Sequence, residues 1–142
     1  MPILYFPEKH KHLVEDLCVK PVVDGGSPIF PKYRDLMLFA AMVGKYSGVG
    51  GSREGNGGEV DSSYFASSNF NKEGVVYLMG ILDFRDPEKL KDGAKDCWKQ
   101  FESYCAGGMD IISGWLDQAT TLEDYPDVLE ENILTAARKS RR

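Results

Sequence analysis

The stretch Pro31–Gly44, which reads PKYRDLMLFAAMVG, decides the fold that we predict. Proline is tolerated in the first turn of a helix, and every residue from Leu36 to Val43 is apolar. A helix that is apolar on nearly all sides belongs in the centre of a bundle. Gly44 is the natural C-cap of such a helix. The sequence therefore predicts a central helix over residues 31–43, with the other elements packed around it.

The rest of the chain offers further helices, most of which begin near a proline or a capping side chain and carry an apolar face. We expect them over residues 7–19, 75–84, 86–105 and 109–116, and from 124 to near the C-terminus. A strand is the alternative for the β-branched start of 75–84, and residues 59–70 fit either a short helix or an extended segment. Gly107 and Gly108 are expected to break or kink the chain.

The predicted fold class is therefore all-α, a compact single domain over residues 1–142 with about five to six helices. Residues 45–58 are rich in glycine and predict a flexible surface loop, while 136–142 form a basic C-terminal tail. The spacing of the glycines does not match a phosphate-binding loop. Six aromatic residues are predicted to form one core: Tyr33, Phe39, Trp98, Phe101, Tyr104 and Trp115.

Composition limits the classes of function. The net charge of −5 and the pI of about 5.0 do not fit the overall electrostatics of a non-specific DNA-binding protein, although a local basic patch is compatible with them. The cysteines Cys18, Cys97 and Cys105 are odd in number and contain no CxxC, which indicates reduced thiols and a cytoplasmic location. We find neither a signal peptide nor an apolar run of the roughly 20 residues that span a bilayer.

No catalytic constellation is evident, so we interpret the chain as a non-enzyme without cofactor or metal. His10 and His12 lie two positions apart on a predicted helix, so they point in different directions, and we expect both to be exposed. Cys97 and Cys105 fit buried structural thiols better than nucleophiles. The acidic residues around the helix start near 86 suit the positive end of that helix: Asp83, Asp86, Glu88, Asp92 and Asp96.

Cationic residues are the candidate contacts to DNA or to a protein partner, because they can bind phosphates and carboxylates. They are Lys32, Arg34, Lys45, Arg53, Arg138, Lys139, Arg141 and Arg142. Arg34 stands beside a very apolar run, where an unpaired buried charge is costly. We predict an ion pair between Arg34 and Glu102, with a solvent-exposed Arg34 as the alternative.

Three segments together carry a resemblance to a known family. They are IFPKYRDLMLFAAMVG at 29–44, VVYLMGILD at 75–83 and QFESYCAGGMDII at 100–112. They resemble the stretches F-x-x-Y-x-D-x-x-x-F-A-A-x-x-G, i-x-x-l-A-L-x-x-t-x-D and F-E-x-Y-A-x-x-G-L-x-x-I of DNA phosphorothioation-associated protein 4, a dnd system-associated family. The resemblance spans about residues 8–118. It departs from the family at Cys105, where alanine is frequent. It also departs in SGVGGSREGNGG at 47–58, where the family usually has basic residues and a proline and this chain has only Arg53.

The resemblance implies a prokaryotic system that installs or polices sulfur in the DNA backbone, a form of restriction-modification and antiviral defence. Within that setting we predict a non-enzymatic accessory or adaptor subunit that binds a larger protein of the modification or restriction machinery. One alternative is a small DNA-binding module of the same system. A small nuclease subunit is a third.

Overall fold

The computed structural model describes residues 2–23, 25–52, 54–67, 70–91, 94–119 and 121–140; within these, the side chains of 67, 70, 71, 139 and 140 are not described. Five α-helices lie in these ranges, together with short 3-10 turns and strands. The α-helices are α1 (Lys11–Cys18), α2 (Tyr33–Ser47), α3 (Glu73–Phe84), α4 (Lys95–Leu116) and α5 (Tyr125–Ser140). The predicted mostly helical, compact fold is confirmed.

The strands are short and pair in two antiparallel ribbons. β1 (Ile3–Tyr5) pairs with β2 (Glu59–Asp61) in a register that places Leu4 opposite Val60. β3 (Ala66–Ser67) pairs with β4 (Phe70–Asn71). Leu4 and Val60 are almost completely buried, so the first ribbon packs its apolar side onto the helices. The segment after the glycine-rich loop combines the two predicted alternatives, since a 3-10 turn at Ser62–Phe65 lies between strands β2 and β3.

The 3-10 turns connect these elements: η1 (Glu8–His10), η2 (Ser62–Phe65), η3 (Pro87–Leu90) and η5 (Leu122–Asp124). η1 leads directly into α1, which confirms a helical segment near 7–19. η3 corrects the prediction of one helix over 86–105. Asp86 caps the turn by accepting a hydrogen bond from the Glu88 amide, but the backbone is extended at Lys91, so the helix ends there. α4 begins four residues later.

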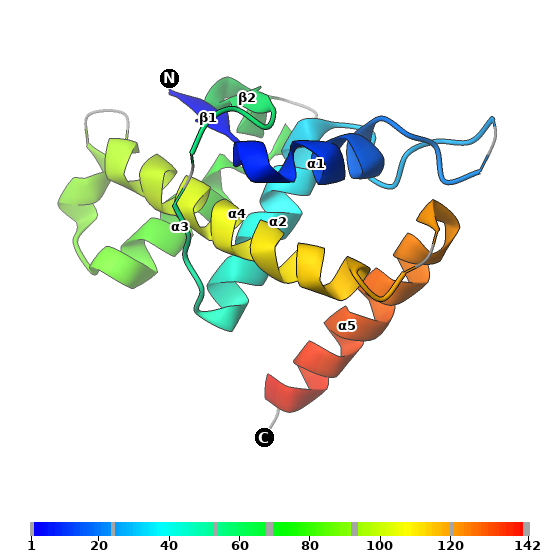
Figure 1. Ribbon diagram of the computed structural model, residues 1–142. Coiled ribbons are helices and arrows are strands. Elements are labelled where there is room, and N and C mark those ends of the chain that lie inside the picture. Colours follow the sequence, from blue (N-terminus) through cyan, green and yellow to red (C-terminus); the bar gives the residue numbers. More distant parts are fainter. Residues whose placement is uncertain are drawn as a thin grey trace.

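The crossing of α2 and α4 forms the centre of the molecule, where the cyan helix passes the yellow one in Figure 1. Gly44 lies inside α2 instead of capping it; the C-cap is Gly48, whose φ of 68° suits glycine. A Cβ at Gly44 would lie 2.1 Å from the Tyr104 carbonyl oxygen, and one at Gly108 would lie 1.7 Å from that of Ala40. Glycine on both helices therefore lets the two backbones approach closely.

This close approach also corrects the prediction for Gly107 and Gly108. α4 is continuous across them, because both glycines face packed backbone: Gly108 faces α2, and Gly107 faces the Val49 carbonyl of the glycine-rich loop. A glycine in a helix costs about 1 kcal/mol relative to alanine, a cost that tertiary packing offsets. The same loop donates a hydrogen bond from the Gly51 amide to the Ser103 carbonyl oxygen, at 3.0 Å, so it follows the surface of α4.

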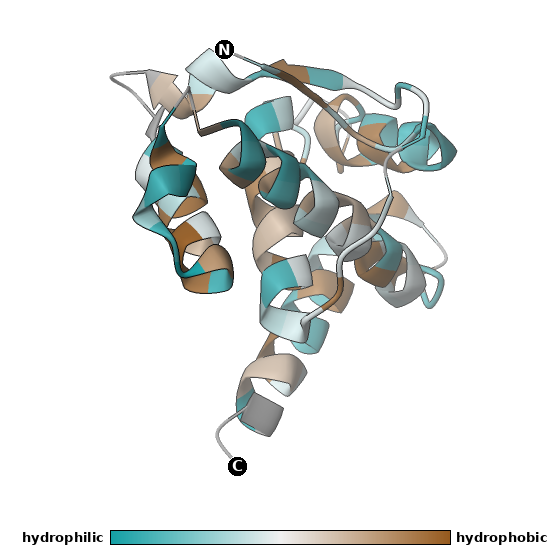
Figure 2. Cartoon of the chain, turned by 90° about the vertical axis from the view of Figure 1, so that its left-hand side faces the viewer, coloured by the Kyte–Doolittle hydropathy of each residue, from teal (hydrophilic) through white to brown (hydrophobic). Residues whose placement is uncertain are grey.

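The core continues from this crossing through a cluster of aromatic rings. Trp98 and Phe101 are buried, as predicted, and Phe65 packs against both, at centroid distances of 5.8 and 5.3 Å. The other four predicted residues are partly buried and pack against the same core: Tyr33, Phe39, Tyr104 and Trp115. Figure 2 shows hydrophobic and hydrophilic segments alternating along the helices, which is the pattern of packed amphipathic elements.

Candidate functional site

A surface pocket of about 440 Å³ lies at the start of α2, and it brings together two of the predicted contact residues. Lys32 and Arg34 line it with the β2 and η2 segments, which contribute Glu59, Val60 and Tyr64. The Arg34 guanidinium donates a hydrogen bond of 3.2 Å to the Tyr64 carbonyl oxygen. The sequence neighbours 32 and 34 meet here because Lys32 precedes the helix in extended backbone and Arg34 lies in its first turn.

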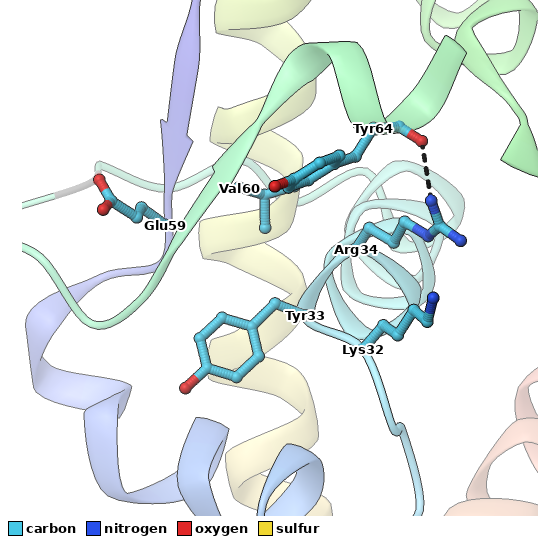
Figure 3. Close-up of a pocket in the computed structure, with 6 residues that line it drawn as sticks. All are labelled: Lys32, Tyr33, Arg34, Glu59, Val60 and Tyr64. Carbon is cyan, nitrogen blue, oxygen red and sulfur yellow. Dashed lines mark hydrogen bonds between the residues drawn. The ribbon is translucent and has the colours of Figure 1, made fainter. Parts of the chain in front are cut away.

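The orientation of these side chains sets what the pocket can bind. Figure 3 shows Lys32 and Arg34 extending to the same side, while Tyr33 points the other way and Glu59 lies at the far edge. An ammonium and a guanidinium group side by side can bind a carboxylate or a phosphate. The carboxylate of Glu59 reduces the positive charge of the whole pocket, so it differs from a uniformly basic surface.

Lys45, the third predicted contact, lies at the other end of α2 and belongs to a polar cluster. Its ammonium group pairs with one oxygen of Asp83, and its charge lies 5.4 Å from the centre of the Tyr104 ring. The other Asp83 oxygen accepts hydrogen bonds from Tyr104 at 2.5 Å and from Gln100 at 3.1 Å. The cluster therefore ties α2, α3 and α4 together through one carboxylate.

The ionisation of this cluster follows from its contacts. Burial alone would raise the pKa of Asp83, but the hydrogen bonds from Lys45, Tyr104 and Gln100 lower it below its ordinary value. The hydrogen bond to Asp83 raises the pKa of Lys45. Both groups are held in their charged forms, which suits a structural ion pair better than a general acid or base.

A second polar cluster joins the N-terminal segment to α4. The His10 Nε2 atom lies 2.6 Å from an Asp110 carboxylate oxygen, and the Lys9 ammonium lies 2.9 Å from the same atom. Burial opposes ionisation of Asp110, yet the hydrogen bonds from His10 and Lys9 lower its pKa. The prediction that His10 is exposed was wrong, because its ring packs against α4 at 9% exposure; His12 is exposed, as predicted.

The cysteines are buried and free, as predicted for structural thiols. Burial raises the pKa of Cys18 to about 12, and it also raises the pKa of Cys97 and Cys105. Such thiols stay protonated at neutral pH and are poor nucleophiles. Among the residues that the structure describes, His, Cys, Asp and Glu side chains form no group of three that could hold a metal ion.

The remaining predicted contacts lie elsewhere. Arg138 is exposed on α5, where Lys139 also lies, because the helix continues through most of the predicted tail to Ser140. Arg53, Arg141 and Arg142 lie outside the described residues. Lys32 and Lys45 are thirteen positions apart on or next to α2, roughly 20 Å along a helix axis. The predicted cations therefore do not gather on one described surface.

The predicted partner of Arg34 has a described contact of its own. Glu102, in the middle of α4, accepts a hydrogen bond of 2.9 Å from the Tyr5 amide at the end of β1. Arg34 donates to Tyr64, as described above. The ion pair between Arg34 and Glu102 stays a prediction.

Comparison with known protein families gives a match over residues 4–141 to the family described as DNA sulphur modification system-associated protein 4. The chain belongs to this family. Comparison with curated proteins gave no match, and comparison with solved structures gave none either. Within the described residues, no helix has both the length and the apolar character to cross a membrane.

The geometry gives physical reasons for the segments that resemble DNA sulphur modification system-associated protein 4. Gly44 and Gly108 form the close crossing of α2 and α4. Asp83 and Tyr104 meet in the polar cluster that includes Lys45. Phe30 packs against Phe39 with tilted rings at a centroid distance of 5.2 Å. These segments therefore meet in the interior and hold the fold together.

Sequence reasoning missed the partners that come from distant parts of the chain. In the sequence, Asp83 belongs to an acidic stretch and to the end of a family-like segment, and no role is predicted for Asp110. Both pairs join residues separated by 38 or more positions, at distances that no local pattern encodes. The available signal was the helical position of Asp83, on the same side of α3 as the buried Val76 and Met79.

Proposed function

We propose that this protein is a non-enzymatic accessory subunit that binds a larger protein of the DNA sulphur modification machinery through the outer face of α3. The family supplies the setting, since its members are described as associated with that system. The exposed apolar side of α3 is the observation that carries the proposal. The residues on this side of α3 also suggest that the partner is recognised through aliphatic side chains on one helix.

α3 is apolar on the side that packs and also on the side that faces outward. Val76, Met79 and Gly80 are buried, and Gly80 lies so close to α4 that a Cβ there would meet the Cys97 sulfur at 2.3 Å. On the opposite side, Leu78 and Leu82 are 59% and 54% exposed. A helix that is apolar all round is normally buried, so the outer side of α3 favours a partner.

Two exposed residues and one partly buried residue, Val75, have a spacing that suits recognition of a helix face. Val75, Leu78 and Leu82 stand at positions i, i+3 and i+7, which lie on one side of an α-helix. Partners that bind such a face commonly offer an apolar groove that accepts these three anchors. Ile81 borders the same stripe and is half-buried. We name the four residues Val75, Leu78, Ile81 and Leu82 the α3 stripe.

The non-enzymatic part of the proposal rests on how the reactive groups are used. The carboxylates of Asp83 and Asp110 already pair with the ammonium groups of Lys45 and Lys9, and the three thiols are buried. A general base needs a free lone pair directed at a substrate, and a nucleophilic cysteine needs a lowered pKa. The contacts of these five groups suit a structural role, which supports the non-enzymatic proposal.

Co-expression with the proteins encoded by the neighbouring genes, followed by capture through a tag on this chain, tests the proposal. The Leu78→Glu/Leu82→Glu variant should lose a partner that the unchanged protein captures. The matched control is Val19→Glu/Val23→Glu, whose side chains are 57% and 55% exposed on another part of the surface, and which should keep the partner. Recovery of the unchanged chain alone, or equal capture by both variants, would overturn the proposal.

A DNA-binding module of the same system is the second candidate, favoured by the pocket that holds Lys32 and Arg34. Contacts to phosphates release counterions, so affinity should fall steeply with salt. A gel-shift series at rising salt should then show binding that Lys32→Ala weakens and that Lys99→Ala, at an exposed position on α4, leaves unchanged. No shift at low salt removes this candidate.

A further inference from the structure

α5 differs from the other long helices because much of it extends away from the body of the molecule. Figures 1 and 2 both show its C-terminal end projecting beyond the remaining helices. Its inner side packs on the core through Leu129, which is 5% exposed, and through the partly buried Tyr125 and Val128. The opposite side faces solvent along its whole described length, so it is available to another molecule.

The solvent side of α5 carries a regular pattern of three exposed residues. Glu130, Leu134 and Arg138 follow one another at intervals of four positions, which places them in a row on one face of the helix. Leu134, in the middle, is 45% exposed. The row therefore has an acid at one end, an apolar residue at its centre and a base at the other end.

This row is complementary to itself when its direction is reversed. When two copies of α5 lie antiparallel and are centred on Leu134, the two Leu134 side chains face each other. Glu130 of each copy then faces Arg138 of the other copy. Four residues span roughly 6 Å along a helix, so both ion pairs lie that far from the central contact. A contact of this kind has two-fold symmetry and closes after two chains. We propose that α5 forms this antiparallel contact with α5 of a second copy of the chain.

The surface beside the row supplies apolar area for the same contact. Ile133, next to Leu134, is 39% exposed and lines a groove of about 270 Å³ between α2 and α5. Met42 and Tyr46, on the α2 wall of the groove, are 50% and 57% exposed. A second α5 lying along the row covers Ile133 and reaches the edge of this groove. The two α5 helices and the edge of the groove together form a small interface, at the low end of the roughly 1,200–2,000 Å² of surface that stable interfaces typically bury.

The size and chemistry of the contact define its behaviour in solution. A small interface gives a dimer that dissociates on dilution, and its exposed ion pairs are weakened by salt. The α3 stripe is on a different helix, so this self-association does not depend on the proposed docking of a larger protein.

Sedimentation velocity over a range of concentrations at low and high salt tests the contact, with one chain of 15.8 kDa as the reference mass. We expect the average mass to rise towards two chains as the concentration increases, and less so at high salt. Glu130→Arg and Arg138→Glu should each raise the dissociation constant at least tenfold. Combining them should restore association to near the original level, because the reversed charges again face each other.

Restoration in the combined variant identifies a contact between chains. The two residues are eight positions apart, roughly 12 Å along the helix, which is too far for an ion pair within one chain. Glu123→Arg, an equal charge change at an exposed position of η5, is the control and should leave association unchanged. Circular dichroism verifies that each variant keeps its helices. A monomer at every concentration, or dimers unaffected by either single reversal, would overturn the proposal.

Discussion

α4 and α5 are both long helices, yet they differ in how much of their surface is buried. α4 is enclosed by its neighbours, with buried residues from Cys97 to Leu116, whereas on α5 only Leu129 is buried among the residues whose side chains are described. Because Gly107 and Gly108 of α4 have no side chains, other segments of the backbone can approach it closely. α5 keeps charged and apolar side chains on its solvent face. The comparison separates a region that maintains the fold from the outer faces of α3 and α5, which we propose as binding surfaces.

The largest effect should come from removing a ring in the enclosed region. Phe101→Ala should lower the free energy of unfolding by about 3–5 kcal/mol, because the ring is fully buried beside Phe65 and Trp98. Phe39→Ala should cost less, since Phe39 is only partly buried. Chemical denaturation monitored by circular dichroism measures both. Equal losses in the two variants would show that burial around α4 is not what sets stability.

A smaller but more specific effect concerns the glycines of α4. Gly108→Ala should destabilise by roughly 1–3 kcal/mol, because the added methyl group meets the Ala40 backbone of α2. Gly114→Ala, on the same helix with open space around the added Cβ, should stabilise by about 0.5–1 kcal/mol through better helix propensity. Melting temperatures should therefore move in opposite directions. A shared direction would contradict the close crossing of α2 and α4.

The smallest effect is expected in how stability depends on pH through the polar cluster around Asp83. The pKa of Asp83 is lower in the folded chain than its ordinary value of 3.8, so the cluster contributes stability above that pH. This contribution should be lost as the pH falls from 3.8 towards the lower folded-state pKa. Asp83→Asn should be less stable near neutral pH and should lose less stability on acidification. If the stability of both proteins changed with pH in the same way, Asp83 would not be the source of this pH dependence.

The helices could largely be predicted from the sequence because their signals are local. Apolar runs indicate helices over residues 31–43 and 75–84, and a proline in the first turn indicates the start of α5. The roles of Gly44 and Gly108 could not be predicted in the same way. A glycine that ends a helix and a glycine that admits a second backbone have the same local sequence, and only tertiary packing distinguishes them.

The candidate sites show the same division between local and distant information. Lys32 and Arg34 share a pocket because they are neighbours in sequence. Lys45 was predicted as a contact for DNA or a partner protein, and its ion pair with Asp83 depends on how α3 packs beside α2. The pairing of β1 with β2 joins segments more than 50 positions apart, so the burial of Leu4 followed from no local pattern. The α3 stripe, with Leu78 and Leu82 exposed, can be recognised only once the buried side of α3 is known.

Hydrogen–deuterium exchange on the free chain and on its complex with the captured protein tests the central claim most directly. We predict that the amides of α3 become more protected in the complex, while those in the crossing of α2 and α4 change little because they are already enclosed. Unchanged exchange in α3, with new protection confined to the Lys32–Arg34 pocket or to α5, would contradict the assignment of the α3 stripe as the docking face.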